Sequence, residues 1–203
     1  MADLDKDRIA AAALAVVDEH GAAAFTMRAV AEALGVTPMA LYHHVEDKAA
    51  LVGLVIEAAI SEQPLPSATG VWQDDLCELA HWVRRSAHAH PAVAHLHRAN
   101  QRWTPTMMPM NERWISIWQQ SGLPFERALE AAKVSGLAIY GYVDAELRLQ
   151  QMDRPDDAML DWLPNARALF STESDFDVDF QLVVRALIDG LHARLTQLTT
   201  TQR

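Results

Sequence analysis

The sequence predicts an all-α protein, and three observations support this fold class. Apolar residues recur at intervals of three and four along most of the 203-residue chain, which is the period of a helix with one buried face. Glycine and proline fall between these periodic segments, where helices end and begin. No segment alternates apolar and polar residues as a half-buried strand would. Half of the residues are hydrophobic, which is enough for a sizeable core.

The first predicted helix runs from about residue 4 to residue 20. Its buried stripe consists of Ile9, Ala13, Val16 and Val17. Gly21 follows the last periodic residue, at the position where glycine commonly ends a helix. We expect this helix to support the two short helices that come after it.

Residues 25–51 have the pattern of two short helices, a tight turn between them, and the start of a third helix. Thr26 can cap the first helix, because its hydroxyl can accept a hydrogen bond from an unpaired N–H. Gly35 ends that helix, since glycine adopts the left-handed conformation at little cost. Thr37 caps the second helix, and Pro38 occupies its first position, where a missing N–H does no harm. This layout is a helix-turn-helix, whose second helix fits the major groove of DNA.

The outer surface of this motif predicts the DNA contacts. Leu41 and Val45 are four residues apart and can face the core, which leaves the rest of the second helix outside. We expect phosphates to be held by Thr26, Arg28, Tyr42, His44 and Lys48. We expect base edges to be read by Thr37, Pro38, Met39 and His43. The alternative is a helical core fragment with a chance turn.

The motif is followed by a helix and then by a linker. Lys48 begins a helix that extends to about residue 62 and could connect two domains. Residues 63–70 contain proline, serine and glycine, which is typical of a linker. We therefore predict a helix-turn-helix DNA-binding domain at residues 1–50 with a connecting helix at 48–62. Residues 63–203 form the predicted C-terminal ligand-binding and dimerisation domain.

The C-terminal segment predicts mostly long amphipathic helices. They are expected at about 72–90, 92–100, 110–121, 124–151 and 176–198, with one or two short helices at 159–163 and 166–170. We expect the helix after Pro124 to be the longest. Small side chains that would allow close approach of another helix stand at Ser135, Gly136, Ala138 and Gly141. With the last helix they predict a four-helix bundle between two copies, hence a homodimer; internal packing alone is the alternative.

Aromatic residues and methionines gather between residues 82 and 142. This composition suits a mostly apolar small-molecule cavity, in which methionine adapts to varied shapes. An ordinary core is the alternative. The candidate lining residues are Trp82, His97, Asn100, Trp103, Met107, Met110, Trp114, Trp118, Tyr140 and Tyr142.

The composition argues against several other classes of protein. No apolar run approaches the length of a membrane span, and we expect no signal region at the N-terminus. The single cysteine, Cys77, rules out an internal disulfide and fits a reducing cytoplasm. There is no nucleophile–base motif, no glycine-rich phosphate loop and no metal-ligand spacing. We therefore predict neither an enzyme nor a cofactor nor a metal site.

The net charge of −10 argues against a generic nucleic-acid coat. Even the first 50 residues are acidic, with four lysine or arginine side chains against eight carboxylates. Because few phosphates can be neutralised, we expect a modest salt dependence of DNA binding. Recognition would then depend on the geometry of the helix-turn-helix more than on charge.

Two segments, FTMRAVAEALGV and LYHHVEDKAAL, resemble the TetR family of one-component transcriptional repressors over about the first 60 residues. The resemblance implies an all-helical homodimer with an N-terminal DNA-binding domain and a C-terminal ligand and dimerisation domain. It also places the nine predicted contact residues at the DNA-contact positions of the family. WQDDL, residues 90–97, QQSGL and ERAL are similar to the tetracycline-repressor subfamily. That similarity puts His97 where the subfamily has a histidine for the metal of a drug–metal complex. Pro64 and Leu79 replace its drug-binding histidine and asparagine, which disfavours tetracycline.

Two functions agree with these observations. The first is a dimeric repressor that binds a palindromic double-stranded operator and is released by a small, largely apolar or aromatic effector. The second is a DNA-binding regulator without a small-molecule ligand, controlled by a protein partner. A hollow among the tryptophans and methionines favours the first function, and a filled core favours the second.

Overall fold

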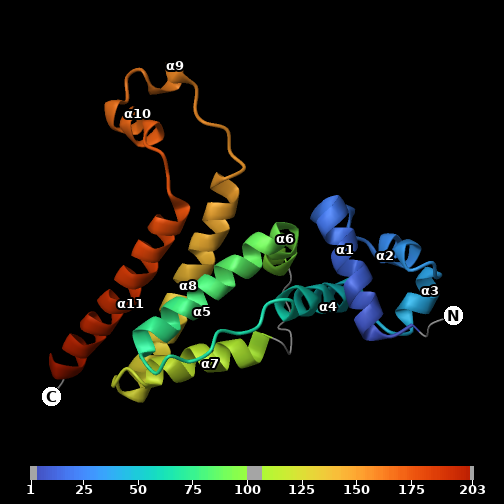
Figure 1. The fold of residues 1–203 in the computed structure, drawn as a ribbon, viewed down its shortest axis with the longest axis horizontal. Coiled ribbons are helices and arrows are strands. Elements are labelled where there is room, and N and C mark those ends of the chain that lie inside the picture. The colour runs from blue at the N-terminus through green and yellow to red at the C-terminus, as the bar shows by residue number, and fades with distance from the viewer. Residues whose placement is uncertain (1–3, 100–106, 202–203) are drawn as a thin grey trace.

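The computed structural model describes residues 4–99 and 107–201, and its regular elements are all helices (Figure 1). This confirms the predicted fold class. The helices are α1 (Lys6–Ala24), α2 (Met27–Ala33), α3 (Pro38–Tyr42), α4 (Lys48–Ser61), α5 (Trp72–Ala89), α6 (Pro91–Ala99), α7 (Met107–Gln119), α8 (Phe125–Leu149), α9 (Asp157–Leu160), α10 (Pro164–Ser171) and α11 (Phe176–Thr201). No helix in the described ranges is long and apolar enough to cross a membrane.

Two separate hydrophobic cores organise these helices. The first is built by α1–α4, and Val93 and Leu96 of α6 complete it. The second lies among α5, α7, α8 and α11. Figure 1 shows α1–α4 at one end of the molecule and the long C-terminal helices at the other, with α6 beside α1. Helix α6 therefore belongs by sequence to the C-terminal half but packs against the N-terminal core.

The first four helices begin where short polar side chains cap them. Asp5 Oδ1 accepts from the N–H of Arg8 at 2.8 Å, and Thr26 Oγ1 accepts from the N–H of Ala29 at 3.1 Å. At α3 and α4 the same role falls to Thr37 and Asp47. Gly21 has a φ of 78° inside α1, so the regular part of this helix ends where the sequence predicted.

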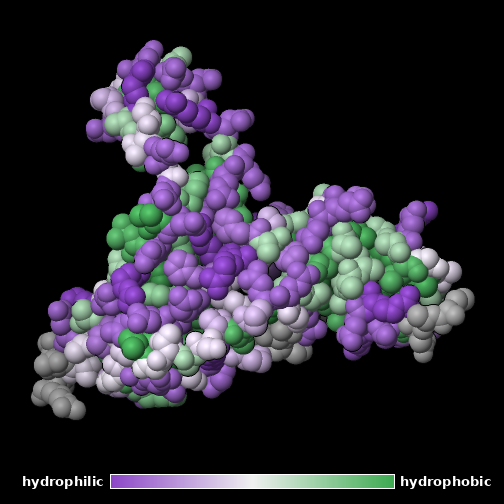
Figure 2. All heavy atoms as spheres, viewed as in Figure 1, coloured by the Kyte–Doolittle hydropathy of each residue, from purple (hydrophilic) through white to green (hydrophobic). Residues whose placement is uncertain are grey.

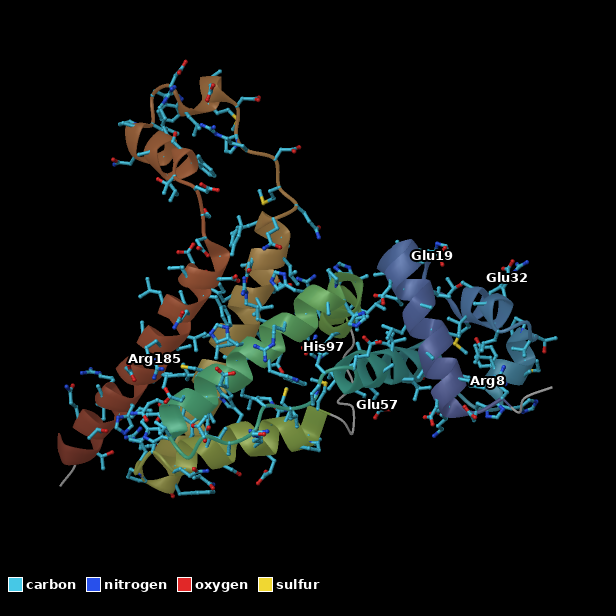
Figure 3. The ribbon with its side chains drawn as sticks, in the orientation of Figure 1. Arg8, Glu19, Glu32, Glu57, His97 and Arg185 are labelled. Carbon is cyan, nitrogen blue, oxygen red and sulfur yellow. The ribbon has the colours of Figure 1, made fainter. Side chains whose placement is uncertain are left out.

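A buried ion-pair network joins three C-terminal helices. Arg84 of α5 donates two hydrogen bonds to Glu146 of α8, at 2.6 and 2.8 Å. The same guanidinium donates to Asp177 of α11 at 2.6 Å. The side chain of Glu146 is only 1% exposed, so the arginine supplies the charge that makes its burial possible. Farther along α11, Arg185 donates to Asp74 of α5 at 2.8 Å (Figure 3).

Some predicted boundaries differ from the structure. The longest helix is α11, with 26 residues, not α8, which has 25. Helix α7 begins at Met107, three residues before the predicted start, because Pro109 lies in its first turn and a proline is tolerated there. Helices α9 and α10 form an excursion that projects away from the ends of α8 and α11 (Figure 1). This excursion carries Trp162 and Leu169, which are 76% and 70% exposed.

The small residues of α8 lie on two different faces. Ser135 is fully buried in the protein's own core, and Gly136 approaches the indole of Trp114. The prediction that both belong to a dimer surface was therefore wrong, because the tryptophans of α7 occupy the space beside them. Ala138 and Gly141 are exposed. They share the outside of the helix with Leu137, which is 70% exposed.

Candidate DNA-binding surface and ligand cavity

The helix-turn-helix consists of α2, a turn at Gly35 and α3. Gly35 has a φ of 67°, the left-handed conformation that a tight turn requires. Leu41 and Val45 point into the first core and are 0% and 3% exposed. The turn and these two anchors hold α3 with its opposite side facing outward.

All nine predicted DNA-contact residues lie on the exposed surface: Thr26, Arg28, Thr37, Pro38, Met39, Tyr42, His43, His44 and Lys48. Met39 and Tyr42 are large and are 69% and 49% exposed. Two apolar side chains held in solvent on a short helix indicate a surface that meets another molecule. Both lie on the second helix of the motif, which is the helix that enters the major groove in helix-turn-helix proteins.

Lys48 is the first residue of α4, and its ammonium lies 5.7 Å from the ring centroid of Phe25. Phe25 is fully buried, so the lysine stem rests on the first core while its charge stays outside. Helix α3 contains no acidic residue. Along α1, Glu19 lies at the opposite end from Arg8 (Figure 3). The acidic residues among the first 50 therefore lie outside α3.

A cavity of about 1080 Å³ opens among α4, α5, α6, α7 and α8. Its volume lies just above the usual range for small-molecule sites, which is roughly 300–1000 Å³. Six of the predicted residues line it: Trp82, His97, Met107, Met110, Trp114 and Tyr140. Asn100 and Trp103 lie outside the described residues. Figure 3 places His97 among α4, α5, α6 and α7.

Trp118 and Tyr142 do not line this cavity. Trp118 is fully buried, its indole N–H donates to Ser135 Oγ at 3.0 Å, and its ring lies 5.6 Å from that of Trp72. Tyr142 packs against Phe180 of α11, with ring centroids 5.7 Å apart. Placing Trp118 in the pocket was wrong, because one turn beyond Trp114 its ring is enclosed in the second core by Trp72 and α8.

Two polar side chains that line the cavity, His97 and Tyr140, are neutral. Desolvation by the surrounding protein lowers the pKa of His97 below its ordinary value of 6.5. The same effect raises the pKa of Tyr140 to about 12. Their rings meet edge to face with centroids 6.3 Å apart. Only a thioether partners the Tyr140 hydroxyl, Met110 Sδ at 3.8 Å. Both side chains are thus uncharged near pH 7, with hydrogen-bonding capacity left over.

The described residues offer neither a group of metal ligands nor a thiol with a lowered pKa. Within residues 4–99 and 107–201 there is no group of three histidine, cysteine or carboxylate side chains that could hold a metal ion. Cys77 is half-buried, and desolvation raises the pKa of its thiol. Asp74 and Glu78 nearby act in the same direction, so the reactive thiolate form is disfavoured.

The two halves of the chain match two family models. The model described as "Bacterial regulatory proteins, tetR family" covers residues 9–55, which include the helix-turn-helix. The model described as "Tetracyclin repressor-like, C-terminal domain" covers residues 64–195, more than half of the chain. The chain belongs to the TetR family. TetR-family regulators are DNA-binding transcription factors, not enzymes.

Individual members of the TetR family align at moderate identity. An HTH-type transcriptional regulator from Saccharopolyspora erythraea is 28% identical over 70% of this chain, which spans only 61% of that protein. The tetracycline repressor of class E from Escherichia coli is 27% identical over 97% of this chain and 95% of its own length. Apo ActR from Streptomyces coelicolor superimposes with a TM-score of 0.79 at 29% identity, covering 98% of this chain and 99% of ActR.

The predicted lining of this TetR-family chain missed several residues, among them Asn111, Lys133 and a buried histidine. His90 stands between α5 and α6, lines the cavity, and is 8% exposed. Its Nδ1 lies 2.9 Å from Asp18 Oδ2 of α1, and its Nε2 lies 3.1 Å from Glu62 Oε2 after α4. The imidazole thus lies between carboxylates of two different segments. These partners are 72 and 28 residues away, so no local pattern could have revealed them.

Proposed function

We propose that this protein is a ligand-responsive repressor that binds a near-palindromic operator as a homodimer and is released by a small, largely apolar or aromatic effector. The cavity of about 1080 Å³ carries this proposal, because a filled core would have favoured control by a protein partner. ActR, at 27–30% identity, has been solved in complex with (S)-DNPA and with actinorhodin. A similar cavity in a similar fold supports a small-molecule effector here.

The parts of the chain proposed to bind DNA and to bind the effector correspond to the two cores. Residues 1–50, with the connecting helix at 48–62, would bind DNA, and residues 63–203 would bind the effector and the second copy. The first core closes around α1–α4, which supports the N-terminal assignment. As a regulator that acts on the chromosome, the protein would work in the cytoplasm.

The walls of the cavity suggest how an effector would reach the DNA-binding surface. Ile56, Ala59 and Ile60 of α4 line the cavity, and α4 packs along α1 in the first core. His90 links the same wall to Asp18 and Glu62. An effector that shifts α4 or α6 would therefore move the helix-turn-helix. By linkage, DNA must weaken effector binding by the same factor as the effector weakens DNA binding.

The outer faces of α8 and α11 are the proposed dimer surface. Val134 of α8 and Val178 and Leu182 of α11 are exposed apolar side chains. Figure 2 shows hydrophobic side chains on the outer side of α11 below the α9–α10 excursion. Two copies joined here would place two recognition helices about one DNA turn apart, roughly 34–36 Å, as a two-fold operator requires.

The test is fluorescence anisotropy on DNA from upstream of the gene and its divergent neighbour, with scrambled DNA as reference, across a range of salt. We expect tight binding of a palindromic site by two chains. His43→Ala should reduce discrimination between sites, and Lys48→Ala should weaken all DNA about equally. Glu126→Ala, at the exposed start of α8, is the control far from α3 and should leave binding unchanged. Equal, weak binding to specific and scrambled DNA would count against the assignment.

A further inference from the structure

The chemistry of the cavity wall restricts the class of effector. Most of the surface is apolar, and Trp82 and Trp114 supply flat aromatic rings. The indole N–H of Trp82 already donates to the carbonyl of Gln63 at 3.2 Å, and that of Trp114 donates to Ala132 O and Ser135 Oγ. Both rings are thus fixed by their polar ends, and what they offer a ligand is aromatic surface.

Four neutral polar groups interrupt this apolar wall. They are the imidazole of His97 on α6, the hydroxyl of Tyr140 on α8, the amide of Asn111 on α7 and the hydroxyl of Ser86 on α5. Of the described residues, none provides a hydrogen-bond partner for the buried Ser86 oxygen. In the described part of the chain, His97 and Asn111 have no hydrogen-bond partner, and Tyr140 has only the thioether of Met110. Groups of this kind bind hydroxyl and carbonyl substituents but do not compensate a buried charge.

Arg98 and Lys133 are the exposed charged side chains of the lining, which puts them at the mouth of the cavity. Arg98 is paired with Asp144, which also accepts from Arg148 at 3.0 Å. Lys133 lies one turn of α8 from both Leu129 and Leu137, which are exposed and line the opening. Among the residues whose placement is described, Lys133 has no carboxylate within ion-pairing distance. With histidines counted as neutral, Arg98, Lys133 and Asp144 give the lining a charge of +1, in a chain of net charge −10.

We propose that the effector is an aromatic weak acid, whose ring system lies between the tryptophans and whose anionic group is held at the mouth by Lys133. Its hydroxyl or carbonyl substituents meet His97, Tyr140 and Asn111. The anion stays at the rim because burying it among neutral groups would leave it uncompensated. This inference rests on the proposed function, since it takes the cavity to be the effector site.

The test uses two fluorescent arenes that differ mainly in charge. 1-Anilinonaphthalene-8-sulfonate carries an anionic group, and N-phenyl-1-naphthylamine has the same ring system without it. Both are titrated into the full-length protein and into Lys133→Gln, Lys133→Arg and Lys6→Gln. Lys6→Gln is the matched control, because it removes one exposed lysine charge at the start of α1, away from the cavity.

We expect Lys133→Gln to weaken the sulfonate probe roughly threefold to tenfold and to leave the neutral probe within about twofold. Lys133→Arg should retain most of the affinity for the anion, and Lys6→Gln should bind both probes normally. Ala87→Trp, which puts an indole into the cavity, should weaken both probes and so locate them there. Equal effects of Lys133→Gln on both probes, no effect on either, or failure of both arenes to bind would each overturn the inference.

Failure of the proposed repressor function would give a different result in DNA binding from failure of the ligand class. DNA anisotropy is recorded in the same titrations, with operator present. If the anion preference depends on Lys133 but saturating probe leaves DNA binding unchanged, the ligand class stands and the repressor mechanism is contradicted. If probes release the DNA without any preference for the anion, the mechanism stands and the ligand class is wrong.

Discussion

The two cores of this molecule are built differently. Each of the four helices of the first core starts at a side-chain cap: Asp5, Thr26, Thr37 and Asp47. In the C-terminal half, α5, α8, α9 and α10 have no side-chain cap, and the helices enclose a large cavity. The first core depends on local signals and close packing. The second depends on long helices and on contacts between residues far apart in sequence, which lets it keep a hollow for a ligand.

The largest expected effect concerns packing in the first core. Phe25 is fully buried, so Phe25→Ala should destabilise the protein by about 3–5 kcal/mol. Urea unfolding followed by circular dichroism measures the change. Met108→Ala, a truncation of an exposed residue at the cavity mouth, should have a far smaller effect. Similar losses for the two variants would show that Phe25 is not packed in the first core as described.

The second effect tests the long-range contacts of the C-terminal half. Glu146→Gln keeps the volume of the side chain but leaves the Arg84 guanidinium without its buried charge partner. We expect a loss of about 3 kcal/mol in the free energy of unfolding, at the low end for a broken buried pair because Asp177 remains. Asp177→Asn, at the exposed end of the network, is the matched control and should have a much smaller effect. If Glu146→Gln left the free energy of unfolding unchanged, this network would not be what stabilises the second core.

The third effect tests the local caps. Thr37 Oγ1 accepts from the N–H of Ala40 at 3.2 Å, and Thr37→Ala should cost about 1 kcal/mol. Thr37→Ser keeps the hydroxyl and should retain most of the stability. Thermal unfolding of the three proteins measures the difference. If serine is no better than alanine, the hydroxyl does not act as a cap.

The smallest effect is a pH dependence inside the cavity. Because desolvation lowers the pKa of His97 in the folded protein, the unfolded chain binds its proton more readily. The His97 contribution to stability is therefore complete above the ordinary value of 6.5 and declines as the pH falls below it. His97→Phe should remove this decline, measured as the difference between the two proteins in urea midpoints from pH 8 to pH 5. Parallel profiles would show that the site is not desolvated.

The same contrast explains which sequence predictions succeeded. The caps at Thr26 and Thr37, the turn at Gly35 and the inward pair Leu41 and Val45 all depend on neighbours within a few residues, and the structure contains each of them. In the C-terminal half the helices were predicted, but the functions of their faces were only partly right. Trp118 has the helical spacing of a pocket residue, and Ser135 has the helical spacing of a dimer-surface residue. Both side chains nevertheless lie in the interior.

By itself, the sequence determined the all-helical fold, the order of the helices and the exposed surface of the helix-turn-helix, because periodicity and caps act over one or two turns. Only the tertiary structure decided that His90 joins Asp18 to Glu62 and that Arg84 meets Glu146. It also decided that α6 packs on the first core while its other side lines the cavity. Helical spacing defines which side chains share a face, but what that face meets depends on segments tens of residues away.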